Sequence, residues 1–136
     1  MTLMRMTDLL SQLQVHEIIQ IVLVKLEPEM AQQNRDQLLK GMTSTDQQIR
    51  PEYSQQTRKR KGFSTPNLYE TGAFQRDIYA EVRDTTIDLN SRDEKTAKLE
   101  LRYGKIFGLG EQGKRTIREK GSVALINNVA TKLQLL

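Results

Sequence analysis

The sequence contains no cysteine and no tryptophan, and aromatic residues make up only 5% of its 136 residues. The absence of cysteine excludes a disulfide framework, a thiolate metal site and a cysteine nucleophile. The longest apolar run, residues 18–26, is interrupted by Gln20 and Lys25 and is far shorter than the ~20 residues needed to cross a bilayer. The N-terminal residues lack the continuous apolar stretch of a secretory signal, so we expect none. The scarcity of aromatic residues predicts a thin core, either in a small elongated domain or in one covered by other subunits.

The charge is moderately basic and unevenly distributed. The formal net charge is +4, and hydrophobic residues make up 37% of the chain. Residues 1–50 contain five Lys or Arg and six Asp or Glu, whereas residues 51–136 contain sixteen and eleven. A basic surface of this size is compatible with a nucleic acid, with an acidic protein partner, or with solubility alone. The length is that of a single domain.

No arrangement of residues predicts a catalytic or metal site. His16 is the only histidine, and His16-Glu17 begins like the zinc motif H-E-x-x-H, but Gln20 occupies the position of the second histidine. A lone histidine without an orienting partner is more often structural. The carboxylates do not lie in the apolar surroundings that would raise their pKa into a catalytic range. We therefore expect no enzyme activity, no cofactor and no metal.

A glycine-rich segment at residues 108–114, GLGEQGK, resembles phosphate-binding loops in its spacing. Its glycines match G-x-G-x-x-G, and with Lys114 they also match G-x-x-x-x-G-K. However, Arg115 occupies the position where a phosphate loop needs Ser or Thr, and the residues after it are predicted to form a helix rather than a βαβ unit. We interpret the segment as a structural loop that displays Ile106, Phe107 and Leu109.

The N-terminal third is predicted to be helical. Thr7 or Asp8 is a suitable N-cap, and apolar residues recur near helical spacing from there to residue 26. Between residues 18 and 26 apolar side chains surround most of the helix, which predicts burial on more than one side. Pro28 predicts a kink or the first turn of a second helix, and Gly41 is placed to end that helix.

The middle of the chain is predicted to form an arm followed by a turn. Residues 51–61 are expected to form a short polar helix with Pro51 at its first position, ended by Gly62. We expect this arm to swing as a unit onto a neighbouring subunit. Thr71-Gly72 is then expected to form a turn that directs Phe74 and the next segment into a sheet.

The remaining elements are predicted from a change in the spacing of apolar residues along the chain. Apolar residues alternate with polar ones in residues 78–82 and 87–89, which predicts a two-stranded hairpin turning at Asp84-Thr85. A short helix is expected to follow, capped by Ser91 or Asp93. The last helix is expected to begin at Glu111 or Thr116 and to run toward residue 133, weakened or split at Gly121.

These elements predict a single α+β domain, in which N- and C-terminal helices pack on a small antiparallel β-sheet and an extended arm or loop projects. We divide the domain into an N-terminal helical segment, an arm with a short helix, a hairpin with a short helix and a loop, and a C-terminal helix. These segments are residues 1–41, 42–74, 75–110 and 111–136.

The basic run at residues 58–61, Arg-Lys-Arg-Lys, has two interpretations. Its side chains can form a solvated helix face, or they can contact phosphates or an acidic neighbouring subunit. Successive residues of a helix are ~100° apart, so the four charges cannot all face one way. The run therefore favours a diffuse electrostatic contact over one focused phosphate site.

The ordered features of residues 40–110 resemble the tail-completion and virion-morphogenesis proteins of tailed bacteriophages. In that order, a helix ends in glycine, a polar segment leads to Pro-x-Tyr-Ser, Thr, Lys and Gly, and Leu-x-x-Thr-Gly precedes a β-segment. The matching residues are Gln48, Ile49, Pro51, Tyr53, Ser54, Thr57, Lys61, Gly62, Leu68, Thr71, Gly72 and Phe74. The chain departs from the pattern in its very apolar N-terminal helix and in having no proline near Ile106-Phe107-Gly108-Leu109.

The resemblance implies a structural virion protein at the head–tail joint, which assembles as a homo-oligomeric ring around the DNA path. It implies portal, connector or tail proteins as partners, non-specific contact with packaged DNA, no membrane, and a place in the host cytoplasm before assembly. A neck ring, a tail terminator and another position at the joint remain open. The runner-up is a small basic nucleic-acid-binding module. The expected interface residues are Tyr53, Arg58, Lys59, Arg60, Lys61, Phe107 and Leu109.

Overall fold

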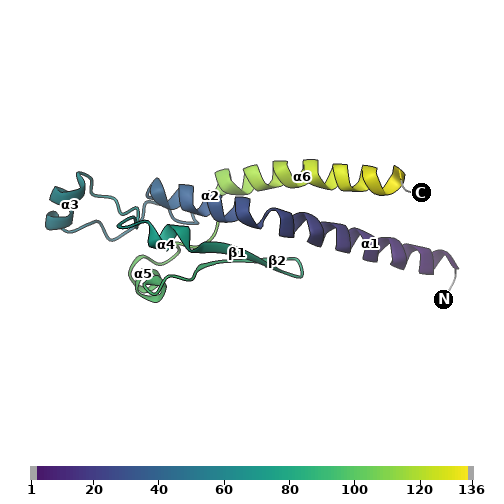
Figure 1. Cartoon of the computed structure of the whole chain (residues 1–136), viewed down its shortest axis with the longest axis horizontal. Helices are drawn as coiled ribbons and strands as arrows, with labels where there is room; N and C mark the ends of the chain where they lie inside the picture. Colours follow the sequence, from purple (N-terminus) through teal and green to yellow (C-terminus); the bar gives the residue numbers. More distant parts are fainter. Residues whose placement is uncertain (1–2, 135–136) are drawn as a thin grey trace.

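The computed structural model describes residues 3–134, which form an α+β fold with helices at both ends and a two-stranded antiparallel sheet. Figure 1 shows an elongated molecule, with both termini near one end of its long axis. The elements are α1 (Leu3–Lys25), α2 (Glu27–Leu39), α3 (Gln55–Lys61), α4 (Ala73–Arg76), β1 (Ile78–Arg83), β2 (Thr86–Ser91), α5 (Thr96–Tyr103) and α6 (Glu111–Gln134).

Helices α1 and α2 together form the long axis of the molecule. The break between them lies at Leu26, and Pro28 lies in the first turn of α2, where its missing N–H costs little. Gly41 follows α2 with a φ of +76°, and a Cβ atom there would lie 2.7 Å from Cγ2 of Thr65. The expected two-helix start and the stop at Gly41 are therefore confirmed. Helix α1 begins at Leu3, so the expected N-cap at Thr7 or Asp8 is wrong.

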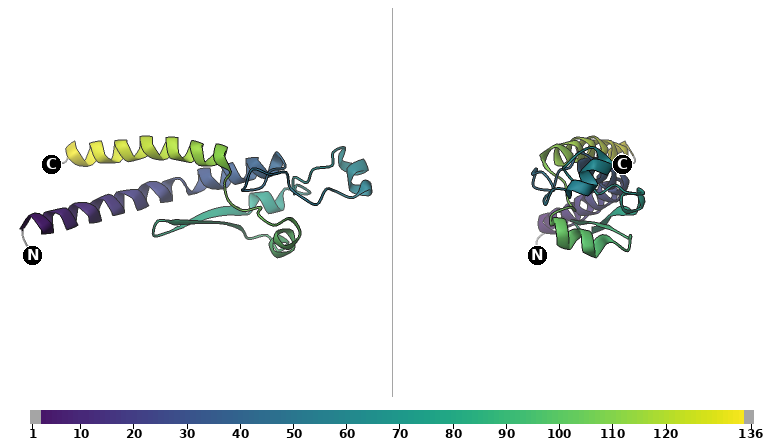
Figure 2. Two further views of the ribbon diagram at one scale, coloured as in Figure 1. Left: turned by 180° about the vertical axis from the view of Figure 1, so that it is seen from behind. Right: turned by 90° about the vertical axis from the view of Figure 1, so that its left-hand side faces the viewer.

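Helix α6 lies along one side of α1 and runs antiparallel to it, while the β-hairpin lies on the other side (Figures 1 and 2). Two apolar clusters hold these layers together. One cluster joins α2, the arm, α4, β1 and the loop before α6, through Ala31, Leu38, Ile49, Leu68, Phe74, Ile78 and Ile106. The other joins α1, α2 and β1 to α6, through Ile18, Val22, Leu26, Met30 and Ala80, with Ile117, Ala124 and Leu125 packed against them.

The hairpin predicted from the alternating pattern is confirmed. Ala80 pairs with Leu89 and Val82 pairs with Ile87 across the two strands, and these four side chains face the second cluster. Asp84, with a φ of +56°, begins the two-residue turn between Arg83 and Thr86. Short polar residues tolerate this left-handed conformation better than branched ones, which fits the turn expected at Asp84-Thr85.

Several expected boundaries are wrong. Helix α3 begins at Gln55, because Ser54 caps it by accepting a hydrogen bond from the Thr57 N–H at 3.3 Å; Pro51 lies outside the helix. Helix α5 has Lys95 at its N-cap rather than the expected Ser91 or Asp93, although the Asp93 carboxylate accepts a hydrogen bond from the Lys95 N–H at 2.8 Å. Helix α6 begins at Glu111, the earlier of the two expected starts, and runs through Gly121 without a break.

The segment after Thr71-Gly72 also differs from the expectation. A one-turn helix, α4, lies between Gly72 and β1, where a strand was expected to follow the turn directly. Phe74 is buried as expected, but it reaches the first cluster from this helix rather than from the sheet.

Candidate interaction surfaces

The glycine-rich loop before α6 is held by two side chains of α2. Asn34, which is fully buried, donates to the Ile106 carbonyl at 3.0 Å and accepts from the Gly108 N–H at 3.1 Å. Gln37 donates to the Gly108 carbonyl at 3.0 Å and accepts from the Gly110 N–H at 2.7 Å. Each amide side chain therefore both donates a hydrogen bond to the loop backbone and accepts one from it, as the backbone of a neighbouring strand would.

The N-terminus of α6 is capped from outside the helix. Asp46, in the loop after α2, accepts a hydrogen bond from the Glu111 N–H at 3.0 Å. A Cβ atom on Gly110 would lie 2.1 Å from Oδ1 of Asp46, so the close approach of this carboxylate requires glycine. Since a phosphate loop presents free N–H groups to its ligand, and those of Gly108, Gly110 and Glu111 already have partners, the structural interpretation of the loop fits the geometry.

The loop does not display its apolar residues as expected. Ile106 is fully buried in the first cluster, so its expected display is wrong. Phe107 is half-buried and packs on Phe74 with ring centroids 5.9 Å apart, and Leu109 is half-buried against the second cluster. Both expected interface residues thus make contacts within their own chain.

The four residues of the basic run differ in their surroundings. Arg60 forms a two-pronged ion pair with Glu70, with N–O distances of 2.9 and 3.1 Å. The Lys61 side chain is largely buried, 4.9 Å from the ring centroid of Tyr53, and donates to the Tyr69 carbonyl. Arg58 and Lys59 are exposed. Two of the four cations therefore hold the arm to the following segment.

Tyr53, the remaining expected interface residue, is half-buried at the base of α3. Its hydroxyl donates to Oδ1 of Asn67 at 3.3 Å and accepts from the Lys61 ammonium at 3.2 Å. Its ring lies 6.0 Å from that of Phe63, measured between centroids. The expected arm is thus closed into a loop by its own contacts at the end of the molecule farthest from the termini (Figure 1).

We predict that the arm loosens in acid. The hydrogen bond from Arg60 is the main cause that lowers the pKa of Glu70 below its usual value, with the charge of Lys61 contributing. A lowered pKa in the folded state means that the pair stabilises the arm above the ordinary glutamate range near ~4.3 and that this stability is lost as the pH falls through the folded pKa. We expect faster amide exchange in α3 near pH ~3 than at pH ~6, after correction for intrinsic rates.

A matched variant isolates this effect. In Glu70→Gln the carboxylate is absent at every pH, so the difference in α3 exchange between the two pH values should disappear. The change in the wild type should be modest, because both partners are more than half exposed and water screens the pair. A wild-type arm equally protected at both pH values would contradict the role of Glu70.

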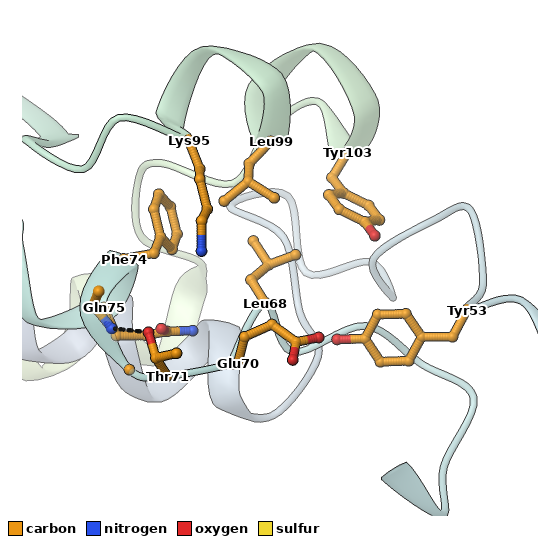
Figure 3. Close-up of a pocket in the computed structure, with 11 residues that line it drawn as sticks. Tyr53, Leu68, Glu70, Thr71, Phe74, Gln75, Lys95, Leu99 and Tyr103 are labelled. Atoms are coloured by element: carbon orange, nitrogen blue, oxygen red, sulfur yellow. Dashed lines mark hydrogen bonds between the residues drawn. The ribbon is translucent and has the colours of Figure 1, made fainter. Parts of the chain in front are cut away.

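A small pocket lies between the arm, α4 and α5 (Figure 3). Lys95, at the N-cap of α5, and Leu99 and Tyr103 of α5 point toward Leu68 and Glu70 on the opposite wall. Its volume is about 100 Å³. The Gln75 side-chain oxygen is buried there without a hydrogen-bond partner among the described residues. Leu68 lies in the first core cluster, and Gly72 is the N-cap of α4.

His16 connects α1 to the hairpin turn. Its Nε2 lies 2.7 Å from Oδ1 of Asp84, and the Gln20 amide donates to the same oxygen at 3.3 Å. This contact fits the structural role expected for a lone histidine. Among residues 3–134, no group of three or more His, Asp or Glu side chains is placed to hold a metal ion. In the same range, no helix has the length and apolarity needed to span a membrane.

Exposed apolar side chains on the two long helices form two separate surfaces. On α1, Ile21 and Val24 are 43% and 50% exposed and border an open groove that Val82 and Asp84 of the hairpin complete. We call this groove, lined by Glu17, Gln20, Ile21, Val24, Lys25, Val82 and Asp84, the α1 groove. On α6, three exposed residues form the α6 ridge: Val123, Ile126 and Val129.

The α1 groove and the α6 ridge face opposite directions. The side of α1 that faces α6 is lined by Ile19, Val22, Leu23 and Leu26, so Ile21 and Val24 lie about the far side of the helix. Helix α6 faces α1 through Ile117, Gly121 and Leu125, which places Val123 outward. Sequence reasoning predicted that residues 18–26 are covered on more than one side. It missed the α6 ridge, although Val123, Ile126 and Val129 recur at a spacing of three.

The surfaces that self-association or a partner could use are therefore the α1 groove, the α6 ridge and the exposed end of the arm. Comparisons of the chain with protein-family models, with curated proteins and with solved structures find no match.

Proposed function

We propose that this protein is a structural subunit of a bacteriophage head–tail joint, a neck or tail-completion component that acts by assembling into a ring around the DNA path. The observation that carries the proposal is the pair of unlike apolar surfaces on opposite sides of the molecule, the α1 groove and the α6 ridge. The resemblance of residues 40–110 to phage tail-completion proteins supplies the biological setting.

Unlike surfaces on opposite sides favour a ring over a two-fold dimer. A two-fold dimer uses the same patch on both copies, whereas contact between two different patches repeats from copy to copy and closes only with the right rotation. Val123 and Ile126 are 60% and 66% exposed in the single chain, and a partner would remove this apolar area from water. The thin, elongated chain is therefore completed by its neighbours in this proposal.

The alternative, a small basic nucleic-acid-binding module, is favoured by the exposure of Arg58 and Lys59 at the far end of the arm. Arg60 and Lys61 already contact Glu70 and Tyr69, which reduces the charge left for phosphates. A module of this kind would show an affinity for DNA that falls steeply with salt. In a ring, Arg58 and Lys59 can face the DNA path without providing the energy of assembly.

The proposal predicts a defined multi-subunit particle. Ile126→Asp places a charge on the α6 ridge and should shift the purified protein to the monomer in mass photometry, without lowering its melting temperature by more than a few degrees. Leu101→Asp is the matched control, because Leu101 on α5 is 90% exposed and lies outside both surfaces; it should assemble like the wild type.

Two results would count against the proposal. A wild-type chain that stays monomeric, alone and with a portal-type ring, would overturn it. Assembly that occurs only on DNA and is abolished by Arg58→Glu with Lys59→Glu would favour the nucleic-acid-binding alternative instead.

A further inference from the structure

We infer that the α1 groove is the docking site for the α6 helix of a second copy of this chain. The inference rests on the proposed ring and specifies its contact. The α1 groove has a volume of about 580 Å³ and is lined by both apolar and charged side chains. The candidate occupant is the outward face of α6, which combines the α6 ridge with a shallow hollow lined by Glu119, Lys120, Val123, Ala124 and Asn127.

The direction of the helices follows from the symmetry of a ring. Within one copy, α6 runs antiparallel to α1 (Figure 1). Neighbours in a ring of many copies are related by a small rotation, so the α6 helix of one copy keeps nearly the same direction in the next. When it packs on the α1 groove of its neighbour, the two helices are therefore again antiparallel, and the layers α6, α1 and hairpin repeat from copy to copy.

This direction fixes a register in which charges and shapes match. Lys25 and Ile21 are four residues apart on α1, and Glu119 and Val123 are four residues apart on α6, a rise of about 6 Å in each case. In antiparallel packing, Glu119 opposite Lys25 places Ile21 opposite Val123. Ile21 then enters the hollow on α6 as a knob enters a hole.

The charged pair of this register is available for the contact. Lys25 and Glu119 are exposed, and neither forms an ion pair within the part of the chain that the structure describes. Lys120, the neighbour of Glu119, is by contrast held by Glu29 of its own chain at 2.8 Å. Opposite charges across an interface fix its register and exclude the slipped alternatives, in which like charges would meet.

A charge exchange tests the register. Lys25→Glu and Glu119→Lys should each raise the protein concentration needed for half-assembly by about tenfold, and the double variant should return it to within about threefold of the wild type. Lys98→Glu on α5 is the control and should leave this concentration unchanged. Circular dichroism checks that each variant is folded.

Cross-linking provides a second measurement, since the chain has no cysteine of its own. Ile21→Cys with Val123→Cys should give a ladder of disulfide-linked multimers on oxidation, whereas either single variant should give at most dimers. If the wild type assembles but the double charge variant stays as weak as the single ones and no ladder forms, the inferred contact is wrong while the proposed ring remains. A wild-type chain that stays monomeric at every concentration overturns both.

Discussion

Asn34→Ala is expected to lower the free energy of unfolding by about 2–4 kcal/mol. The Asn34 side chain is fully buried and bonds to both the Ile106 carbonyl and the Gly108 N–H. Its removal leaves both backbone groups without that partner, the carbonyl in a buried place and the Gly108 N–H in a partly buried one, and an unsatisfied buried group costs about 1–3 kcal/mol. Chemical denaturation in urea, followed by circular dichroism, measures the difference.

A matched substitution separates the hydrogen bonds from the loss of a helical asparagine. Asn127 also lies in a helix, α6, but is exposed, so Asn127→Ala should change stability by less than about 0.5 kcal/mol. Asn34→Asp keeps the shape of the side chain but turns an oxygen toward the Ile106 carbonyl, and it should be at least as damaging as alanine. Equal stability of the wild type and Asn34→Ala would show that the two Asn34 hydrogen bonds do not stabilise the loop.

The sequence predicted those parts of the fold that depend on local patterns. The alternation at residues 78–82 and 87–89 has one dominant physical cause, an apolar face on a two-stranded sheet, and the hairpin follows it. Pro28 and Gly41 act on the backbone within their own turn, so the break before α2 and its end were predictable. The continuity of α6 through Gly121 was not, because the cost of one glycine is about 1 kcal/mol and packing against α1 exceeds it.

The parts that were wrong depend on partners far away in the sequence. Ile106 was expected to be displayed, but it is buried, and Asn34 and Gln37, about seventy positions earlier, satisfy the backbone of its loop. Helix α4 is only one turn long, too short to leave a periodic signal in the sequence. Its carbonyls are bonded by Arg35, which no local pattern could have indicated.

The candidate surfaces were only partly predictable from the sequence. A helix that is apolar nearly all round must be covered on several sides, and residues 18–26 indicated this before the structure was considered. The structure assigns the inner sides to α6 and the hairpin and leaves the α1 groove exposed. Helical spacing indicates that the four side chains of the basic run cannot all face one way, and in the structure they do separate, since Lys61 packs on Tyr53 while Arg58 and Lys59 face water.

Arg35→Met is expected to lower the free energy of unfolding by about 2–4 kcal/mol. The guanidinium of Arg35 donates to the Gln75 and Ile78 carbonyls, each at 2.6 Å, at the end of α4 and the start of β1. Hydrogen bonds from a charged donor are worth about 1.5–3 kcal/mol each, and the partial exposure of Arg35 lets water replace some of that loss. Methionine keeps the apolar stem, so the change reports on the bonds rather than on packing.

Arg35→Lys tests whether the stability depends on the two-pronged geometry of the guanidinium or only on its positive charge. A lysine carries the same charge but a single ammonium group, which cannot reach both carbonyls in the fixed geometry of a guanidinium. We expect it to recover less than half of the stability lost in Arg35→Met, as measured by urea denaturation, with the exposed Arg115→Met as control. Because Arg35 holds the start of the hairpin to α2, and the hairpin supplies one wall of the α1 groove through Val82, both variants should also assemble more weakly than their residual stability alone would explain. Full recovery by lysine would mean that the charge at the end of α4 is sufficient and that the hairpin is positioned by the apolar contacts of Ile78 and Ala80 instead.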